Sequence, residues 1–226
     1  MKRVIQNANK KGSLKNIQVL INKNQDLIDA RIKSRFKDLI EQQIIWISPV
    51  ERDDFAEYWD NKFLKKIGLD PKEIKLENFW PKNGAHWDAL AKTNEEHIIL
   101  IEAKANIPEI ISNASIAKRA ASKALINKSL NQTKAFLNIT NKVDWAGPFY
   151  QYTNRLAHLY YLRNKCEKSV FLVNIYFIGD VSVSGPETKE EWVGALKVMK
   201  KYLGLTRHKL SRYMTDIFIN VQDLTF

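Results

Sequence analysis

The sequence predicts a mixed α/β (α+β) fold, because strand patterns and helical patterns occur together along the chain. Residues 86–91 and 97–104 are mainly apolar runs joined by a short polar loop, which is the pattern of a β-hairpin. The second run is apolar on both faces, as in an interior strand, and residues 169–178 predict a further buried strand. Helical spacing of apolar residues around these runs predicts helices flanking one mixed sheet.

Composition limits the class of protein. The 226 residues suit one domain, or one domain with a terminal extension, and 45% hydrophobic with 27% charged residues is typical of a folded chain. No apolar run reaches the roughly 18 residues of a membrane-spanning helix, and the N-terminus lacks the apolar core of a secretory signal. The single cysteine, Cys166, excludes an internal disulfide and a multi-cysteine zinc site. We therefore expect a cytoplasmic protein with no membrane partner.

The first part of the chain predicts a basic helical extension. Apolar residues with helical spacing begin near Ile17, and the short apolar stretch 44–47 either ends this helix or forms a brief strand. We expect a boundary here, with residues 1–47 as an N-terminal extension packed on a core formed by residues 48–226.

A second helix is expected from Ser48. Serine at this position, Pro49 next and Glu51 third match a capping box with proline at the first helical position. Gly68 is expected to end this helix, and a weaker strand is expected over residues 73–79.

The remainder of the chain predicts three helices and one strand. The helices are expected over residues 115–137, from Gly147-Pro148 to Arg163, and from Thr188 to Gly204. The strand is expected over residues 213–221.

Three charged residues of the hairpin are candidates for catalysis. Asp88 lies in the first run, where aspartate is disfavoured, and Glu102 and Lys104 end the second run on a shared face. If the hairpin turns near residue 95, Asp88 lies opposite Glu102. Facing carboxylates destabilise a sheet unless something bridges them, and a hard divalent cation such as Mg²⁺ or Mn²⁺ would do so. The competing interpretation is a surface ladder of ion pairs near a strand end.

These residues resemble a known motif. Asp88 followed by Glu102-Ala103-Lys104 on a hairpin flanked by helices is similar to the PD-(D/E)XK nuclease superfamily, with Trp87 where the motif has proline. The strings WDALA and ILIEAKA also look like those of uncharacterised bacterial proteins in this group. The resemblance implies a restriction-endonuclease-like αβββαβ core with a mixed central sheet, from about Ser48 to Ile178. It implies metal ligation by Asp88, Glu102 and the Ala103 carbonyl, with Lys104 as the catalytic lysine.

Supporting residues are expected on two helices. The superfamily often adds an acid from the first core helix, and Glu57 is our choice as a further metal ligand, although a solvated helix face explains it equally well. On the helix after Gly147-Pro148, Gln151 and Arg155 share a polar face with Asn154 and His158. Gln151 would orient a water and Arg155 would grip a phosphate; the alternative is a buried hydrogen-bonded helix contact.

The charge distribution predicts a polyanionic partner. The net charge is +11, and residues 110–143 contain six basic and no acidic residues directly after the candidate site. From this stretch we expect Arg119, Lys123 and Lys134 to contact nucleic acid together with Arg155, although a charge run is often only a solvated face.

The combined prediction is a metal-dependent nuclease that hydrolyses phosphodiester bonds with a metal-activated water. The resemblance favours DNA over RNA, Mg²⁺ is the expected cofactor with Mn²⁺ as the alternative, and a homodimer would suit cleavage of both strands. The first competing hypothesis is a catalytically silent, nuclease-like module that binds nucleic acid or a protein. The second is a basic interaction protein whose carboxylates only form ion pairs.

Overall fold

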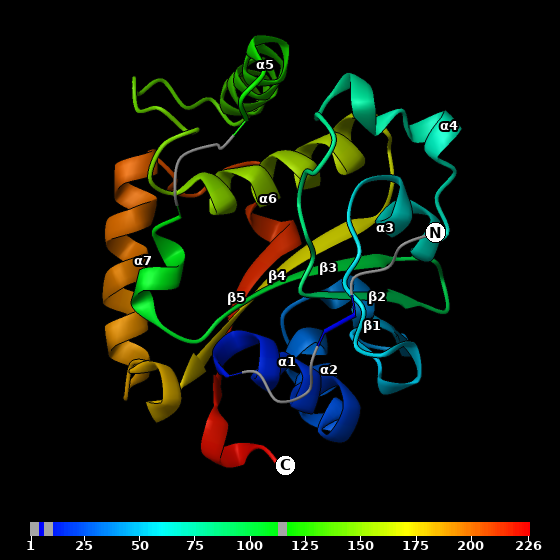
Figure 1. Cartoon of the computed structure of the whole chain (residues 1–226), viewed down its shortest axis with the longest axis vertical. Coiled ribbons are helices and arrows are strands. Elements are labelled where there is room, and N and C mark those ends of the chain that lie inside the picture. The colour runs from blue at the N-terminus through cyan, green and yellow to red at the C-terminus, as the bar shows by residue number, and fades with distance from the viewer. Residues whose placement is uncertain (1–4, 7–10, 113–116) are drawn as a thin grey trace.

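A five-stranded mixed sheet forms the centre of the protein. The computed structural model describes residues 5–6, 11–112 and 117–226. The strands lie in chain order across the sheet: β1 (Ile44–Ser48), β2 (Ala89–Thr93), β3 (Ile98–Lys104), β4 (Val170–Ile178) and β5 (Met214–Asn220) (Figure 1). The pairs β1–β2 and β2–β3 are antiparallel, whereas β3–β4 and β4–β5 are parallel. The predicted α/β class with a mixed sheet is thereby confirmed.

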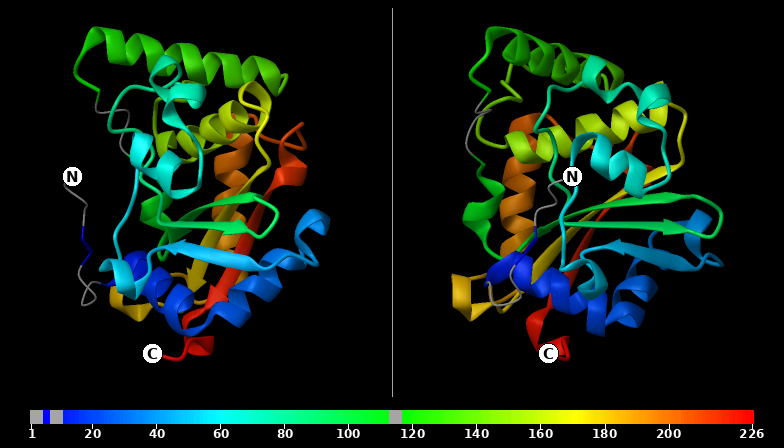
Figure 2. Two further views of the ribbon diagram at one scale, coloured as in Figure 1. Left: turned by 90° about the vertical axis from the view of Figure 1, so that its right-hand side faces the viewer. Right: turned by 45° about the vertical axis from the view of Figure 1, so that its right-hand side comes forward.

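Helices cover both faces of this sheet (Figure 2). They are α1 (Gly12–Lys23), α2 (Gln25–Lys33), α3 (Asp60–Lys66), α4 (Pro71–Ile74), α5 (Ala120–Phe136), α6 (Tyr150–Tyr160) and α7 (Lys189–Leu203). The two N-terminal helices share one apolar core with residues such as Ile99 and Ile101 of β3. Helices α6 and α7 share the other core with residues such as Leu100 of the same strand. The alternation of strand side chains thus supplies two cores from one sheet.

The hairpin of β2 and β3 has the register expected from the sequence. Ala89 pairs with Ile101 and Leu90 pairs with Leu100. Asp88 lies in a bend directly before β2, not within the strand as expected, and the register carries it to the position beside Glu102. A carboxylate outside the ladder escapes the low strand propensity of aspartate while it keeps its place on the sheet.

The helix expected from Ser48 to Gly68 is wrong over most of its length. Strand β1 continues to Ser48, which pairs with Leu90 of β2, so the apolar stretch 44–47 is a strand. The chain then passes through a short 3₁₀ turn, and Tyr58 pairs with Trp87 in an isolated β-bridge. Only α3 is α-helical in this range. Pairing with distant residues has overridden a local capping signal.

Several other element boundaries differ from expectation. The first helix is interrupted at Asn24 and becomes α1 and α2, and the weak strand expected at 73–79 is instead α4 followed by a 3₁₀ turn. Residues 115–116 of the expected 115–137 helix lie outside the described residues, and α5 begins at Ala120. The boundary expected between residues 47 and 48 falls inside β1. In the described part of the chain, no helix is both long and apolar enough to cross a membrane.

Candidate active site

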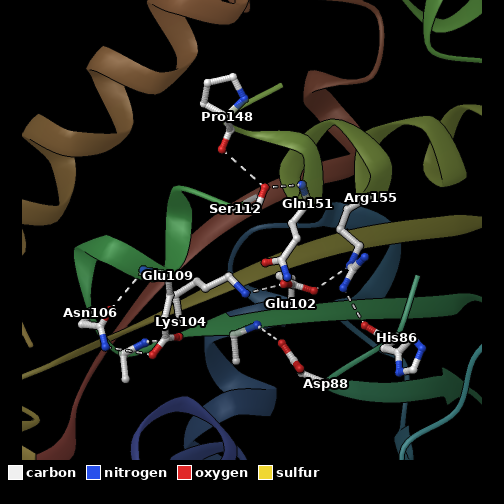
Figure 3. A network of polar contacts seen from close by, with 12 residues as sticks. His86, Asp88, Glu102, Lys104, Asn106, Glu109, Ser112, Pro148, Gln151 and Arg155 are labelled. Carbon is white, nitrogen blue, oxygen red and sulfur yellow. Dashed lines mark hydrogen bonds and ion pairs between the residues drawn. The ribbon is translucent and has the colours of Figure 1, made fainter. Parts of the chain in front are cut away.

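The β2–β3 hairpin brings the two candidate carboxylates together. Asp88 Oδ2 accepts a hydrogen bond from the backbone N–H of Ala103 at 2.7 Å (Figure 3). Glu102 is 7% exposed and lies beside Asp88 on the same face of the sheet. The carbonyl of a strand residue leaves the strand on the same side as its N–H, so the Ala103 carbonyl also faces the Asp88 side. Two carboxylates and one backbone carbonyl therefore share this end of the hairpin.

Two cations hold the Glu102 carboxylate. Lys104 Nζ donates to Oε1 at 2.5 Å, and Arg155 Nε of α6 donates to Oε2 at 2.6 Å. Arg155 Nη2 also donates to the His86 carbonyl at 2.6 Å, and the guanidinium lies over the Trp87 ring. Arg155 is 6% exposed, so this ion pair is screened little by solvent. The surface ladder considered for these residues does not describe this buried cluster.

The pKa values in the cluster move in opposite directions. Burial and then the charge of Glu102 raise the pKa of Asp88 to about 8. Burial alone would raise the pKa of Glu102, but the charges of Arg155 and Lys104 outweigh it and hold that pKa below its usual range. Burial opposes the charge of Lys104, yet Glu102 and Asp88 raise the pKa of this ammonium. Asp88 is therefore the carboxyl group whose ionised form lacks a cation of its own.

Helix α6 places Gln151 and Arg155 over the sheet. Its first turn is fixed by Ser112, whose Oγ accepts from the Gln151 N–H at 2.9 Å. The Gln151 side chain points toward Glu102 and Lys104 and lines a small cavity with them (Figure 3). His158 is buried one turn further on, with Nδ1 at 2.9 Å from the Asn154 carbonyl, and burial lowers its pKa to about 4. On the polar face of α6, Gln151 and Arg155 therefore point to the site, whereas His158 points to the protein interior.

Glu57 lies near the cluster but not on a helix. It belongs to the extended segment next to the Tyr58–Trp87 bridge. Its charge adds to the raised pKa of Asp88, after burial and Glu102. The helical geometry used to select it was wrong, because the bridge replaces the expected helix.

The four residues expected to bind nucleic acid lie in three places: the buried cluster, the start of α5 and the far end of α5. Arg155 is in the buried cluster, and Arg119, at the start of α5, lines a cleft beside it. Lys123 is exposed on the next turn of α5. Lys134 lies near the far end of this helix and donates to the carbonyls of Asn141 and Val143. The structure brings Asp88, Glu102, Ala103, Lys104, Gln151 and Arg155 together, whereas Lys134 serves a loop contact.

An open cleft of about 1090 Å³ adjoins the cluster. One wall is the loop before β2, another is the start of α5, and the floor includes Lys104, Gln151 and Arg155. Lys82 and His86 line the loop wall, and sequence reasoning assigned no binding role to either. The signal in the sequence was a lysine and a histidine in and beside the turn from Pro81 to Gly84.

Two further polar groups near the site were also missed. Glu109 lines the cleft, and its carboxylate accepts from the Ala105 N–H at 3.2 Å and from Asn106 Nδ2 at 3.0 Å. On the other side of Glu102, Asn174 of β4 is the register partner of Glu102 and donates to Asp216 Oδ1 of β5 at 3.0 Å. The contacts of Glu109 are local, whereas the place of Asn174 depends on the register of β4 and β5, which local patterns do not reveal.

Comparison with known protein families, with characterised proteins and with solved structures found no match for the chain. Within residues 5–6, 11–112 and 117–226, no three or more His, Cys, Asp and Glu side chains form a preassembled metal-binding group. The paired carboxylates, the cations bound to Glu102 and the adjoining cleft are therefore the features of this chain that bear on its function.

Proposed function

We propose that the protein is a metal-dependent nuclease that hydrolyses phosphodiester bonds, with DNA as the favoured substrate. The observation that carries the proposal is the pairing of Asp88, directly before β2, with Glu102 of β3, two residues from Lys104, which lines a cleft with exposed basic residues. The order of the strands supports the resemblance to the PD-(D/E)XK superfamily, because an antiparallel β1–β2–β3 unit is followed by a parallel β4.

The donor set fits a hard divalent cation. Asp88 and Glu102 offer carboxylate oxygens, the Ala103 carbonyl faces the same side, and these are the ligand types that Mg²⁺ and Mn²⁺ prefer. Burial and then the charge of Glu102 raise the pKa of Asp88, and a positive charge bound beside it would favour the ionised carboxylate. We propose these three residues as ligands, with Glu57 as a further acid nearby. When bound, the cation would lower the pKa of a water and polarise the phosphate.

The protein's own cations would assist hydrolysis. Water attack forms an oxygen–phosphorus bond, releases a proton from the water to solvent and breaks the bond between phosphorus and the leaving sugar oxygen, so negative charge grows on the phosphate. Because the neighbouring carboxylates raise the pKa of Lys104, this side chain stays protonated at neutral pH and acts as a charge stabiliser, not as a base. The Gln151 amide, which faces the same small cavity, would orient the water.

One observation favours a second function, namely nucleic-acid binding without catalysis. Arg155 and Lys104 occupy both oxygens of Glu102. If these ion pairs persist in the presence of a divalent cation, Glu102 cannot serve as a ligand and the protein would bind without cleaving.

Cleavage assays separate the two functions. Plasmid and single-stranded DNA would be incubated with Mg²⁺, Mn²⁺ or EDTA and with wild type, Asp88→Asn or the matched control Asp223→Asn, which changes an exposed aspartate outside the site. We expect metal-dependent cleavage by wild type and Asp223→Asn and none by Asp88→Asn. Mn²⁺ binding by calorimetry should be lost in the same variant. Cleavage that survives in EDTA or in Asp88→Asn contradicts the proposal, and salt-sensitive binding without cleavage supports the second function.

A further inference from the structure

The cleft carries positive charge that the ion-pair cluster does not use. Lys82, Lys118 and Arg119 line it and are exposed. Among the lining residues of the described chain, Glu109 is the only acid. Since Lys104 and Arg155 are already paired with Glu102, the other three cations are the groups available to a polyanion that enters from solvent.

The loop wall of the same cleft also presents an aromatic ring. The His86 imidazole stacks on Trp59 with ring centroids 4.4 Å apart and an interplanar angle of 3°. His86 is exposed and lines the cleft, whereas Trp59 does not line it. Trp59 therefore covers one face of the imidazole, and the exposed part of the ring lies in the wall of the cleft. Flat side chains of this kind, beside cations, stack on nucleic-acid bases.

The stacked pair of His86 and Trp59, here called the platform, is held in place before any ligand binds. The Asp60 carboxylate, at the start of α3, accepts from the N–H groups of Asn83 at 2.8 Å and Gly84 at 3.0 Å. Arg155 Nη2 fixes the other end of the loop through the His86 carbonyl. A ring held by its neighbours loses little freedom when a ligand binds, which favours affinity.

The position of His86 connects the platform to the carboxylates. His86 precedes Asp88 by two residues, which corresponds to about 7 Å in extended chain. A base stacked on this imidazole would therefore bring its neighbouring phosphate close to Asp88 and Glu102. Bases inside a duplex are already stacked on one another, so a free aromatic face selects bases that are unpaired.

We propose that the cleft binds single-stranded nucleic acid, with one unpaired base stacked on His86 and the adjacent phosphates on Lys82 and Arg119. This inference rests on the proposed nuclease function and specifies its substrate class as a single strand or a frayed end.

The test measures binding in EDTA, so that cleavage plays no part. Fluorescence anisotropy would compare one labelled single-stranded oligonucleotide with the duplex of the same sequence, as DNA and as RNA. We expect tighter binding of the single strand. His86→Ala should weaken this binding roughly 5- to 150-fold, which is the range for loss of one base-stacking contact. His86→Phe, which keeps a flat ring, should bind close to wild type, and His97→Ala provides a histidine control at the other end of β3.

The possible results separate this inference from the proposed function. Equal affinity for single strand and duplex, or wild-type affinity in a His86→Ala protein whose circular dichroism shows it to be folded, would overturn the inference and leave metal-dependent cleavage untouched. Failure of all cleavage, combined with selective single-strand binding that needs the ring at position 86, would overturn the nuclease function and retain the cleft as a binding site. Preferential binding of either the DNA or the RNA single strand supports the inference and shows whether the substrate contains deoxyribose or ribose.

Discussion

Two carboxylate–cation clusters lie in one row across the sheet, and only one of them has the features of a site. Glu102 on β3 pairs with Arg155 and Lys104, while Asp216 on β5 pairs with Lys200 of α7. Asn174 of β4 lies between them as the register partner of both acids. Each cluster is a carboxylate on the sheet held by a basic side chain.

The difference between the clusters is the neighbour of each acid. Glu102 lies beside a second carboxylate, Asp88, whose pKa rises to about 8, whereas Asp216 lies beside the neutral amide of Asn174, which donates to it. The Glu102 side chain is 8% exposed and that of Asp216 is 18% exposed. A buried ion pair alone is a structural element; an extra acid without its own cation turns one cluster into a candidate for metal binding.

The largest expected difference is in stability. Arg155→Met should cost about 3–5 kcal/mol in free energy of unfolding, because it leaves the Glu102 carboxylate buried with one partner fewer. Lys200→Met removes a more exposed pair and should cost about 1 kcal/mol or less. Urea unfolding followed by circular dichroism measures both. Similar losses in the two variants would show that the clusters are energetically equivalent.

Activity should separate the clusters next. Asp88→Asn keeps the size of the side chain but removes the charge proposed to bind the cation, so Mg²⁺-dependent cleavage should fall below detection, a loss of about a hundredfold or more. Asp216→Asn should retain cleavage within a few-fold, since its contacts are with Lys200 and Asn174. Initial rates of cleavage of a labelled oligonucleotide by the two variants and wild type measure these effects. An equal loss of cleavage in both variants would mean that the Asp216 cluster contributes to catalysis as much as the Glu102 cluster does.

The pH dependence of stability gives a third contrast. Between the unfolded pKa of Asp88, about 3.8, and its folded pKa, about 8, the native state holds a proton that the unfolded state has released. Stability should therefore fall as pH rises through this window, by up to about 1.4 kcal/mol per pH unit. Asp88→Asn removes this slope and should exceed wild type in stability at pH 8, with the gap closing toward pH 4.

Chemical denaturation at a series of pH values, without divalent cations, measures this slope. Asp216→Asn serves as the control and should keep the wild-type dependence. Added Mn²⁺ should flatten the wild-type slope, since a bound cation stabilises ionised Asp88. A wild-type curve that is already flat between pH 5 and pH 8 would contradict the raised pKa.

The hairpin was predictable because its determinants are local. Two apolar runs and a short polar loop define the register, and that register brings Asp88 to Glu102. The class of fold followed from the same patterns. The segment after Ser48 shows where local signals fail, because the pairing of Ser48 with Leu90 and of Tyr58 with Trp87 outweighs a capping box.

The rest of the site depends on contacts between distant segments. Arg155 and Glu102 are 53 residues apart, and helical periodicity placed Arg155 on a polar face without identifying its partner. The pairing of Asn174 with Asp216 depends on two crossovers to parallel strands. The contrast between the two clusters is therefore visible only in the folded chain.

The smallest expected effect extends the contrast to the two ends of α5. Arg119 lines the cleft at the start of this helix, whereas Lys134 near its end donates to the carbonyls of Asn141 and Val143. Arg119→Ala should reduce the dependence of log K on log salt concentration by about one, the value of one lost phosphate contact. Lys134→Ala should leave this slope unchanged and instead lower the thermal stability slightly, because two carbonyls lose their donor. Salt titrations of oligonucleotide binding in EDTA measure the slopes. If Lys134→Ala lowers the slope as much as Arg119→Ala does, the whole length of α5 contacts nucleic acid, and the bound strand extends well beyond the cleft beside Asp88.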